Sequence, residues 1–407
     1  MSRIFGILCC AAALMPSGAF AEGLTGAWSG KLNVTPQNAL RIVFNVDGES
    51  VTMDSPDQNA YGIPCEVAHL SADSLNVGVK RLGMNYAGAL RGDSLVGTFR
   101  QGMYRFPLTL SPGVKKAARP QTPQPPFPYT SEDVTVIAAD AVLAGTLTMP
   151  AGASADTPVA LLVSGSGLQN RDEELFEHRP FAVLADFLAR NGIATLRYDD
   201  RGCGESKGDA RNATTADFAA DAEAAVRWLR SSGRFSKVGL IGHSEGGIIG
   251  YMLGARPETL DFIISVAGPS VPGETILTYQ NTLALIDSGK DEATAEQMAR
   301  TIVANLMEQK STGPWMAYFL RQDPASAMKD IHIPAFIIYG EKDTQVPPSL
   351  NLGPAQAAAP QATVKTYPGL NHLMQHASTG RLSEYVEIEE TIAPEVLTDI
   401  AAFIRSL

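Results

Sequence analysis

The chain has 407 residues, of which 45% are hydrophobic and 18% are charged, so it can bury a sizeable core. A formal net charge of −11 argues against nucleic acid and anionic membrane surfaces as partners, since both repel an acidic protein. This length leaves room for a catalytic domain of about 250 residues and a second, smaller domain.

The first 21 residues have the pattern of a secretory signal. A basic start at Arg3 precedes an apolar run over residues 4–15, and an Ala-x-Ala cleavage site ends at Ala21. Because the apolar run is too short to span a bilayer comfortably, we expect cleavage after Ala21 and no stable membrane insertion. The mature protein is then expected to be periplasmic or secreted.

Cleavage at this point leaves two cysteines, Cys65 and Cys203, which we assign to different domains. A stabilising disulfide framework is therefore not expected. The sequence has no Cys/His cluster with the spacing of metal ligands, and we predict no metal and no other cofactor.

Residues 22–112 have the pattern of a small all-β domain. Short alternating runs such as 40–46 and 75–79 are separated by Asp, Gly and Ser turns, which favours an antiparallel meander or a small barrel. The proline-rich residues 113–129 follow, and they favour an extended spacer before a catalytic domain over residues 130–407. We expect the core of the β domain to contain Trp28, Phe44, Phe99 and Phe106.

Two glycine-containing loops follow apolar runs early in the catalytic domain. The run Val159–Val163 leads into Ser164-Gly165-Ser166-Gly167, where small residues let the main chain approach a ligand closely. This loop lacks the Gly-Lys-Ser/Thr ending of a phosphate-binding loop, and its dinucleotide pattern is incomplete, which disfavours nucleotide binding. The second loop lies in the stretch of residues 197–206, and there we expect Asp200 and Arg201 to pair with each other beneath the floor of an active site.

Ser244 is the candidate nucleophile. The apolar run 237–242 breaks into Gly242-His243-Ser244-Glu245-Gly246 and resumes as an apolar helix, the pattern of a buried strand that turns directly into a helix. Such a tight turn requires small residues two positions before and after the serine. A helix that starts at residues 214–217 is expected to precede this strand.

A serine hydroxyl requires a base and a group that orients the base. Asp343 follows the apolar run 334–339, and His372 follows the alternating run 362–367. The chain order Ser244, Asp343, His372 places each group just beyond the carboxyl end of a predicted strand. Glu341 and Asp200 are the rival orienting acids. His243, His332, His69, His178 and His376 are less suited to act as the base.

About sixty residues separate the strand at 262–266 from the strand before Asp343. Segments 275–285 and 293–307 have helical patterns, and we interpret residues 271–330 as a helical cap. Candidate pocket walls in this segment are Tyr279, Leu283, Trp315, Met316, Tyr318 and Phe319, and internal packing of the cap is an equal alternative for each of them.

On these motifs the chain resembles the α/β-hydrolase superfamily, and within it secreted bacterial serine esterases of the EstD and cinnamoyl-esterase type that carry an amino-terminal β module. Ser164 stands where those esterases commonly have histidine, and Leu168 and Asn170 stand where Pro and Asp are frequent. The resemblance implies a mostly parallel sheet with helices on both faces and a helical cap. It also implies an oxyanion hole formed by the N–H of Glu245 and that of Ser166 or Gly167.

These inferences predict a carboxylic ester hydrolase that acts on a small-molecule ester through an acyl-enzyme. A serine peptidase or amidase of prolyl-oligopeptidase-like type would use the same groups, and Arg171, Glu173 and Glu174 could then bind a peptide terminus. A non-catalytic binding protein on the same scaffold is the third alternative. The sequence leaves the oligomeric state, the acyl group and the alcohol open.

Overall fold

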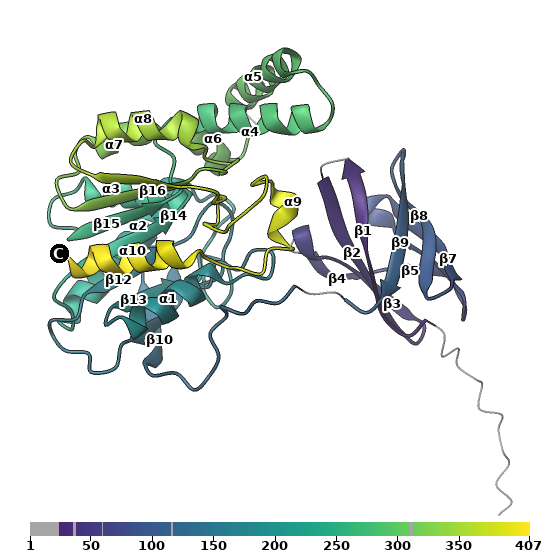
Figure 1. Ribbon diagram of the computed structural model, residues 1–407, viewed down its shortest axis with the longest axis horizontal. Coiled ribbons are helices and arrows are strands. Elements are labelled where there is room, and N and C mark those ends of the chain that lie inside the picture. The colour runs from purple at the N-terminus through teal and green to yellow at the C-terminus, as the bar shows by residue number, and fades with distance from the viewer. Residues whose placement is uncertain (1–23, 36–37, 59, 115–116, 310–311) are drawn as a thin grey trace, which may run out of the picture. The chain divides into compact units, whose positions relative to one another are not determined.

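The computed structural model describes residues 24–35, 38–58, 60–114, 117–309 and 312–407. Two compact units divide the chain near residue 115, and Figure 1 shows the elements of each. The predicted signal segment lies outside the described residues. None of the helices in these ranges is both long and apolar enough to cross a membrane.

The N-terminal unit is a nine-stranded sheet in the order β4-β3-β2-β1-β9-β8-β7-β6-β5. Pairing is antiparallel from β2 to β4 and from β5 through β9 to β1, which confirms the antiparallel β domain. Trp28, Phe44 and Phe99 are buried in its core as expected, and Phe106 packs against that core half-buried. The strands are β1 (Gly26–Thr35), β2 (Asn38–Asp47), β3 (Ser50–Ser55), β4 (Ala60–Pro64), β5 (Glu66–Leu70), β6 (Ser74–Val79), β7 (Met84–Arg91), β8 (Ser94–Gln101) and β9 (Tyr104–Pro112), with short 3-10 turns at Pro56–Gln58 and Lys80–Leu82.

The C-terminal unit contains an eight-stranded sheet in the order β10-β11-β13-β12-β14-β15-β16-β17. β10 and β11 run antiparallel to their neighbours, and the remaining strands are parallel. Central parallel strands are covered on both faces, which explains why their sequences are continuously apolar. The strands are β10 (Thr130–Ile137), β11 (Val142–Met149), β12 (Val159–Val163), β13 (Ala194–Tyr198), β14 (Val238–His243), β15 (Phe262–Val266), β16 (Ala335–Gly340) and β17 (Thr363–Tyr367).

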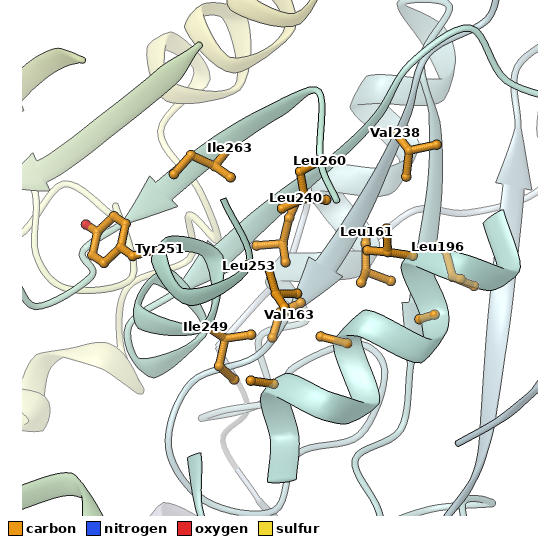
Figure 2. Packing of buried hydrophobic residues seen from close by; sticks show 14 of the residues in the cluster. Leu161, Val163, Leu196, Val238, Leu240, Ile249, Tyr251, Leu253, Leu260 and Ile263 are labelled. Atoms are coloured by element: carbon orange, nitrogen blue, oxygen red, sulfur yellow. The ribbon is translucent and has the colours of Figure 1, made fainter. Parts of the chain in front are cut away.

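Helices cover both faces of this sheet, so the α/β-hydrolase architecture is confirmed. Alternate residues of β12 belong to different cores: Leu161 packs with residues of α2, α3 and α8, and Leu162 packs with residues of α1 and α10. Figure 2 shows part of the first core, around Leu161, Leu240 and Ile249. These helices are α1 (Pro180–Arg190), α2 (Thr215–Ser231), α3 (Glu245–Gly254), α8 (Pro348–Ala358) and α10 (Pro394–Arg405); a short α9 (Leu382–Tyr385) precedes the last.

The predicted start of α2 is confirmed. The Thr214 side chain and the Asp217 side chain form a reciprocal capping box with the backbone of the first turn. Such a box satisfies N–H groups that would otherwise have no partner at the helix start. It fixes the direction in which the chain leaves the loop after β13.

The described residues between β15 and β16 form four helices. They are α4 (Gly273–Asp287), α5 (Glu292–Glu308), α6 (Pro314–Arg321) and α7 (Pro324–Met328), and the first two confirm the helices expected at 275–285 and 293–307. We refer to α4 through α7 as the insertion.

Arg119, in the proline-rich segment, makes contacts within the C-terminal unit. The guanidinium of Arg119 donates to the backbone carbonyls of Phe176, Val386 and Ile388. The side chain of Arg119 therefore holds this part of the proline-rich segment in place, whereas the proline pattern predicted only an extended backbone there.

Candidate active site

Ser244 lies at the junction of β14 and α3 in a conformation that L-residues rarely adopt, with φ 52° and ψ −117°. The turn is close-packed on both sides. A Cβ at Gly242 would lie 2.0 Å from the carbonyl oxygen of Gly246, and a Cβ at Gly246 would lie 2.1 Å from that of Val163. Only glycine fits at either position, and the turn therefore holds the serine in a strained, defined place.

His372 and Asp343 lie side by side although 29 residues separate them. The Nδ1 atom of His372 is 2.7 Å from Oδ2 of Asp343, and both side chains are buried. The other carboxylate oxygen of Asp343 accepts the N–H groups of Gln345 and Val346 at 2.7 and 2.8 Å. Because the carboxylate accepts the Nδ1 proton, Nε2 of a neutral His372 carries a free lone pair and can accept a proton.

A pocket of about 310 Å³ is lined by both Ser244 and His372. The structure thus brings the predicted nucleophile to the same cavity as the predicted base, and the predicted acid lies within hydrogen-bond distance of that base. Helices α4 and α6 supply much of the wall, through Ile276, Leu277, Gln280, Trp315, Met316 and Phe319.

Three expected wall residues lie elsewhere. Tyr279 and Leu283 line a separate groove of about 670 Å³ between α4 and α5, and Tyr318 does not line the pocket. The helical pattern predicted the helices correctly, but it could not say which face of each one meets the site.

The glycine-rich loop lies directly against the serine. A Cβ at Gly165 would come 3.0 Å from the Cβ of Ser244, and Ser166 lines the pocket. Gly167 lies instead at a small cavity beside Glu245. Glu245 is the first residue of α3, where N–H groups have no partner within the helix and can point at an anion.

The expected pairing of Asp200 with Arg201 is wrong. Arg201 forms an ion pair with Asp221, with Nε 2.7 Å from the carboxylate. Asp200 instead accepts the hydroxyl of Ser164 and the N–H of Gln169, and burial raises the pKa of Asp200 to about 8. The two neighbours in the chain bind different partners, so adjacency did not produce contact.

Glu341 was the other candidate for the orienting acid, and His376 was one of the less suited candidates for the base. Neither forms a hydrogen bond with the His372 ring within the described part of the chain. Glu341 accepts the N–H of Gly369, and His376 is an exposed histidine that pairs with Glu390 and Glu395. Within the described ranges, no group of three or more His, Cys, Asp or Glu residues could hold a metal ion.

Glu173 and His243 both line the pocket. The sequence suggested Glu173 only as a possible binder of a peptide terminus, and it disfavoured His243 as the base. Glu173 accepts the N–H of Gly165 at 2.8 Å and faces Nδ1 of His243 at 2.9 Å. The Nε2 atom of His243 lies 3.1 Å from the carbonyl oxygen of His372. No local pattern could reveal these contacts, because 70 residues separate the carboxylate from the imidazole.

A parallel sheet with helices on both faces and a strand–serine–helix turn at its carboxyl edge defines an α/β-hydrolase. The chain has the α/β-hydrolase fold. A model of the serine aminopeptidase family S33 matches residues 177–377, which include the serine, the aspartate and the histidine.

Esterase EstD of Thermotoga maritima is 30% identical to the chain over 229 residues, which are 54% of each protein. The chain thus spans about half the length of this curated relative. A solved hypothetical protein of Pseudomonas aeruginosa, PA2218, has the same fold, with a TM-score of 0.50 and 16% identity over 72% of this chain and 99% of that one. Est1E of Butyrivibrio proteoclasticus, solved with ferulic acid bound, covers 67% of this chain and 98% of its own at 16% identity, with a TM-score of 0.47.

Proposed function

We propose that the protein is a carboxylic ester hydrolase in which Ser244, His372 and Asp343 form a catalytic triad. The observation that carries the proposal is the Asp343–His372 hydrogen bond at the same pocket as a serine held in a strained turn. The relationship to an esterase supports the choice of ester as substrate.

In the proposed mechanism the Ser244 hydroxyl attacks the ester carbonyl carbon while its proton passes to Nε2 of His372. The oxyanion accepts hydrogen bonds from the N–H of Glu245 and from that of Ser166, which lines the pocket, or of Gly167. His372 then gives its proton to the departing alkoxide, which leaves an acyl-enzyme. Water, activated by the same imidazole, hydrolyses the acyl-enzyme and restores the serine.

We propose that the insertion acts as the cap over the substrate. Its α4 and α6 side chains form an apolar and aromatic wall, and the pocket volume of about 310 Å³ suits a short or medium acyl group or one small ring. No Lys or Arg is among the described residues that line it, so an uncharged acyl group fits best.

The peptidase alternative is favoured by the description of the matching family. The charged residues that could bind a peptide terminus are engaged elsewhere: Arg171 pairs with Asp199, and Glu174 pairs with Arg179. Glu173 does line the pocket, but its carboxylate accepts the N–H of Gly165 and faces His243. Neither Arg171 nor Glu174 lines the pocket. These contacts support an ester over a peptide.

The test compares hydrolysis of a short-acyl and a medium-acyl chromogenic ester with that of an aminoacyl anilide, using purified mature protein. Ester turnover that disappears in Ser244→Ala supports the proposal, and preferential anilide turnover would support the peptidase. We expect Ser244→Ala and His372→Ala to lower kcat by about four to six powers of ten. Failure of a fluorophosphonate to label Ser244 in folded protein would instead support a non-catalytic role.

We also propose that the protein is exported and cleaved after Ala21. N-terminal sequencing of protein recovered from the periplasm or medium of an expressing bacterium tests this. A mature chain that begins at Glu22 supports the proposal, and intact cytoplasmic protein contradicts it.

A further inference from the structure

Glu173 connects three segments that the proposed mechanism requires to keep a fixed geometry. Its Oε1 atom accepts the N–H of Gly165 in the loop that lies against Ser244, and it faces Nδ1 of His243, the residue before Ser244. The His243 ring continues the connection, because its Nε2 atom lies 3.1 Å from the carbonyl oxygen of His372. Glu173 is 1% exposed and His243 is 7% exposed, so water does not substitute for either contact.

The two partners of the His243 ring determine its protonation. A backbone carbonyl can only accept a hydrogen bond, and a carboxylate oxygen that already accepts an N–H also acts as an acceptor. Both ring nitrogens therefore face acceptors, at 2.9 and 3.1 Å. A neutral imidazole has one N–H and would leave one of these contacts without a proton, whereas an imidazolium satisfies both.

We propose that Glu173 and His243 form a buried ion pair that positions the proposed acyl-transfer site. The pair holds the loop of Gly165 and Ser166, the turn of Ser244 and the backbone of His372 at fixed separations. The inference rests on the proposed function for its catalytic meaning. Its chemical content, a charged His243 beside the nucleophile, stands on the geometry alone.

The surroundings of His243 agree with a charged ring. Burial lowers the pKa of this histidine, but the carboxylate of Glu173, the carbonyl of His372 and the charge of Asp343 outweigh burial, and the pKa is raised above its ordinary value of 6.5. These residues supply the charged and titratable groups that face the ring, together with the His372 imidazole, whose centroid lies 4.7 Å away.

The backbone of Glu173 supports a positioning role. Its φ of 50° is one that few non-glycine residues adopt, and such strain persists only where the surrounding contacts compensate for it. Apolar side chains such as Phe181, Ile241 and Val266 line a small cavity that the carboxylate and the imidazole share. In such surroundings a charge is tolerated only when it is paired.

The first experiment measures the protonation of His243 in the unmodified protein. Long-range ¹H–¹⁵N spectra of histidine-labelled protein, with signals assigned by single substitutions, are recorded from pH 5 to pH 9. We expect an imidazolium pattern for His243 that persists above pH 6.5. A neutral His243 at pH 6 would overturn the ion pair without any reference to catalysis.

The second experiment uses Glu173→Gln, which keeps the length and the acceptor but removes the charge. We expect kcat on the ester to fall about 10- to 100-fold with KM within about two-fold, because the reacting groups are misplaced while the pocket wall is retained. The His243 signals should change to a neutral pattern in the same variant. Unchanged kcat in folded Glu173→Gln protein would refute the positioning role.

The matched control is Glu174→Gln, one residue along the chain, whose carboxylate pairs with Arg179 on the half-exposed surface. We expect native kcat from this variant. If the unmodified protein hydrolyses no ester, the proposed function fails, and the rate of fluorophosphonate labelling of Ser244 replaces kcat. Should Glu173→Gln not fold, the spectra of the unmodified protein still decide whether the ion pair exists.

Discussion

The indole Nε1 of Trp315 lies 3.0 and 3.1 Å from the two carboxylate oxygens of Glu245, the residue that follows Ser244. Thr215 at the start of α2 donates its hydroxyl to the same carboxylate at 2.6 Å. The Glu245 side chain is buried, so these donors replace water. A residue of the insertion and pocket wall is thereby tied to the residue whose N–H is proposed to bind the oxyanion.

The substitution Trp315→Phe keeps an aromatic ring that can stack on Phe319 but removes the indole N–H. Glu245 then retains Thr215 as its side-chain donor, and we expect a loss of about 1 to 3 kcal/mol in the free energy of unfolding of the C-terminal unit. KM for the ester should rise, because α6 carries part of the wall. Calorimetry and steady-state kinetics measure the two effects, with Trp228→Phe on α2 as the control; equal stability of the two variants would contradict the argument.

The glycine at 246 is predicted to tolerate no side chain. A Cβ there would lie 2.1 Å from the carbonyl oxygen of Val163 in the central sheet, so Gly246→Ala requires the backbone to move. We expect little folded protein, or folded protein with at least a 100-fold loss of ester turnover. Gly353→Ala is the control, because its Cβ would meet nothing within 4 Å and alanine favours the helix. Native-like stability of Gly246→Ala would show that the turn is looser than the contact implies.

The role of Asp343 is tested by Asp343→Asn. An asparagine cannot hold the Nδ1 proton as a carboxylate does, and its NH₂ group can favour the wrong tautomer of His372. We expect kcat to fall by about four powers of ten with little change in the melting temperature. Retention of more than a tenth of native activity would require a different orienting acid.

The stability of the protein should depend on the protonation of His178. Burial is the main cause that lowers the pKa of this histidine to about 4, and its ring contacts Thr391 and the carbonyl of Tyr385. The unfolded chain binds a proton near pH 6.5 while the folded chain does not. Above pH 6.5 the ring is neutral in both states, and the free energy of unfolding is at its full value. This free energy falls as the pH drops from 6.5 toward 4, because the proton binds the unfolded chain more tightly.

Melting temperatures from pH 8 to pH 4 measure this effect. The difference between unmodified protein and His178→Gln should shrink as the pH falls through that window, because the substitution removes the titrating group. A constant difference across the range would contradict a neutral buried His178.

Local patterns in the sequence predicted the elements that carry the candidate site. The apolar run before Ser244 is β14, the capping signals at Thr214 and Asp217 start α2, and Asp343 follows β16. Each of these signals is contained in a short window of sequence, where periodicity and capping chemistry act directly. The antiparallel β domain was predicted for the same reason.

The sequence by itself determined which residues could act as nucleophile, acid and base, and on which kind of element each would lie. The tertiary structure alone decided that Arg201 pairs with Asp221, that Trp315 reaches Glu245, and that Glu173 reaches His243. The sheet places β12 between β13 and β14, so loops far apart in the chain meet at its edge. Such contacts depend on strand order and on the face each helix presents, and no local window of sequence contains either.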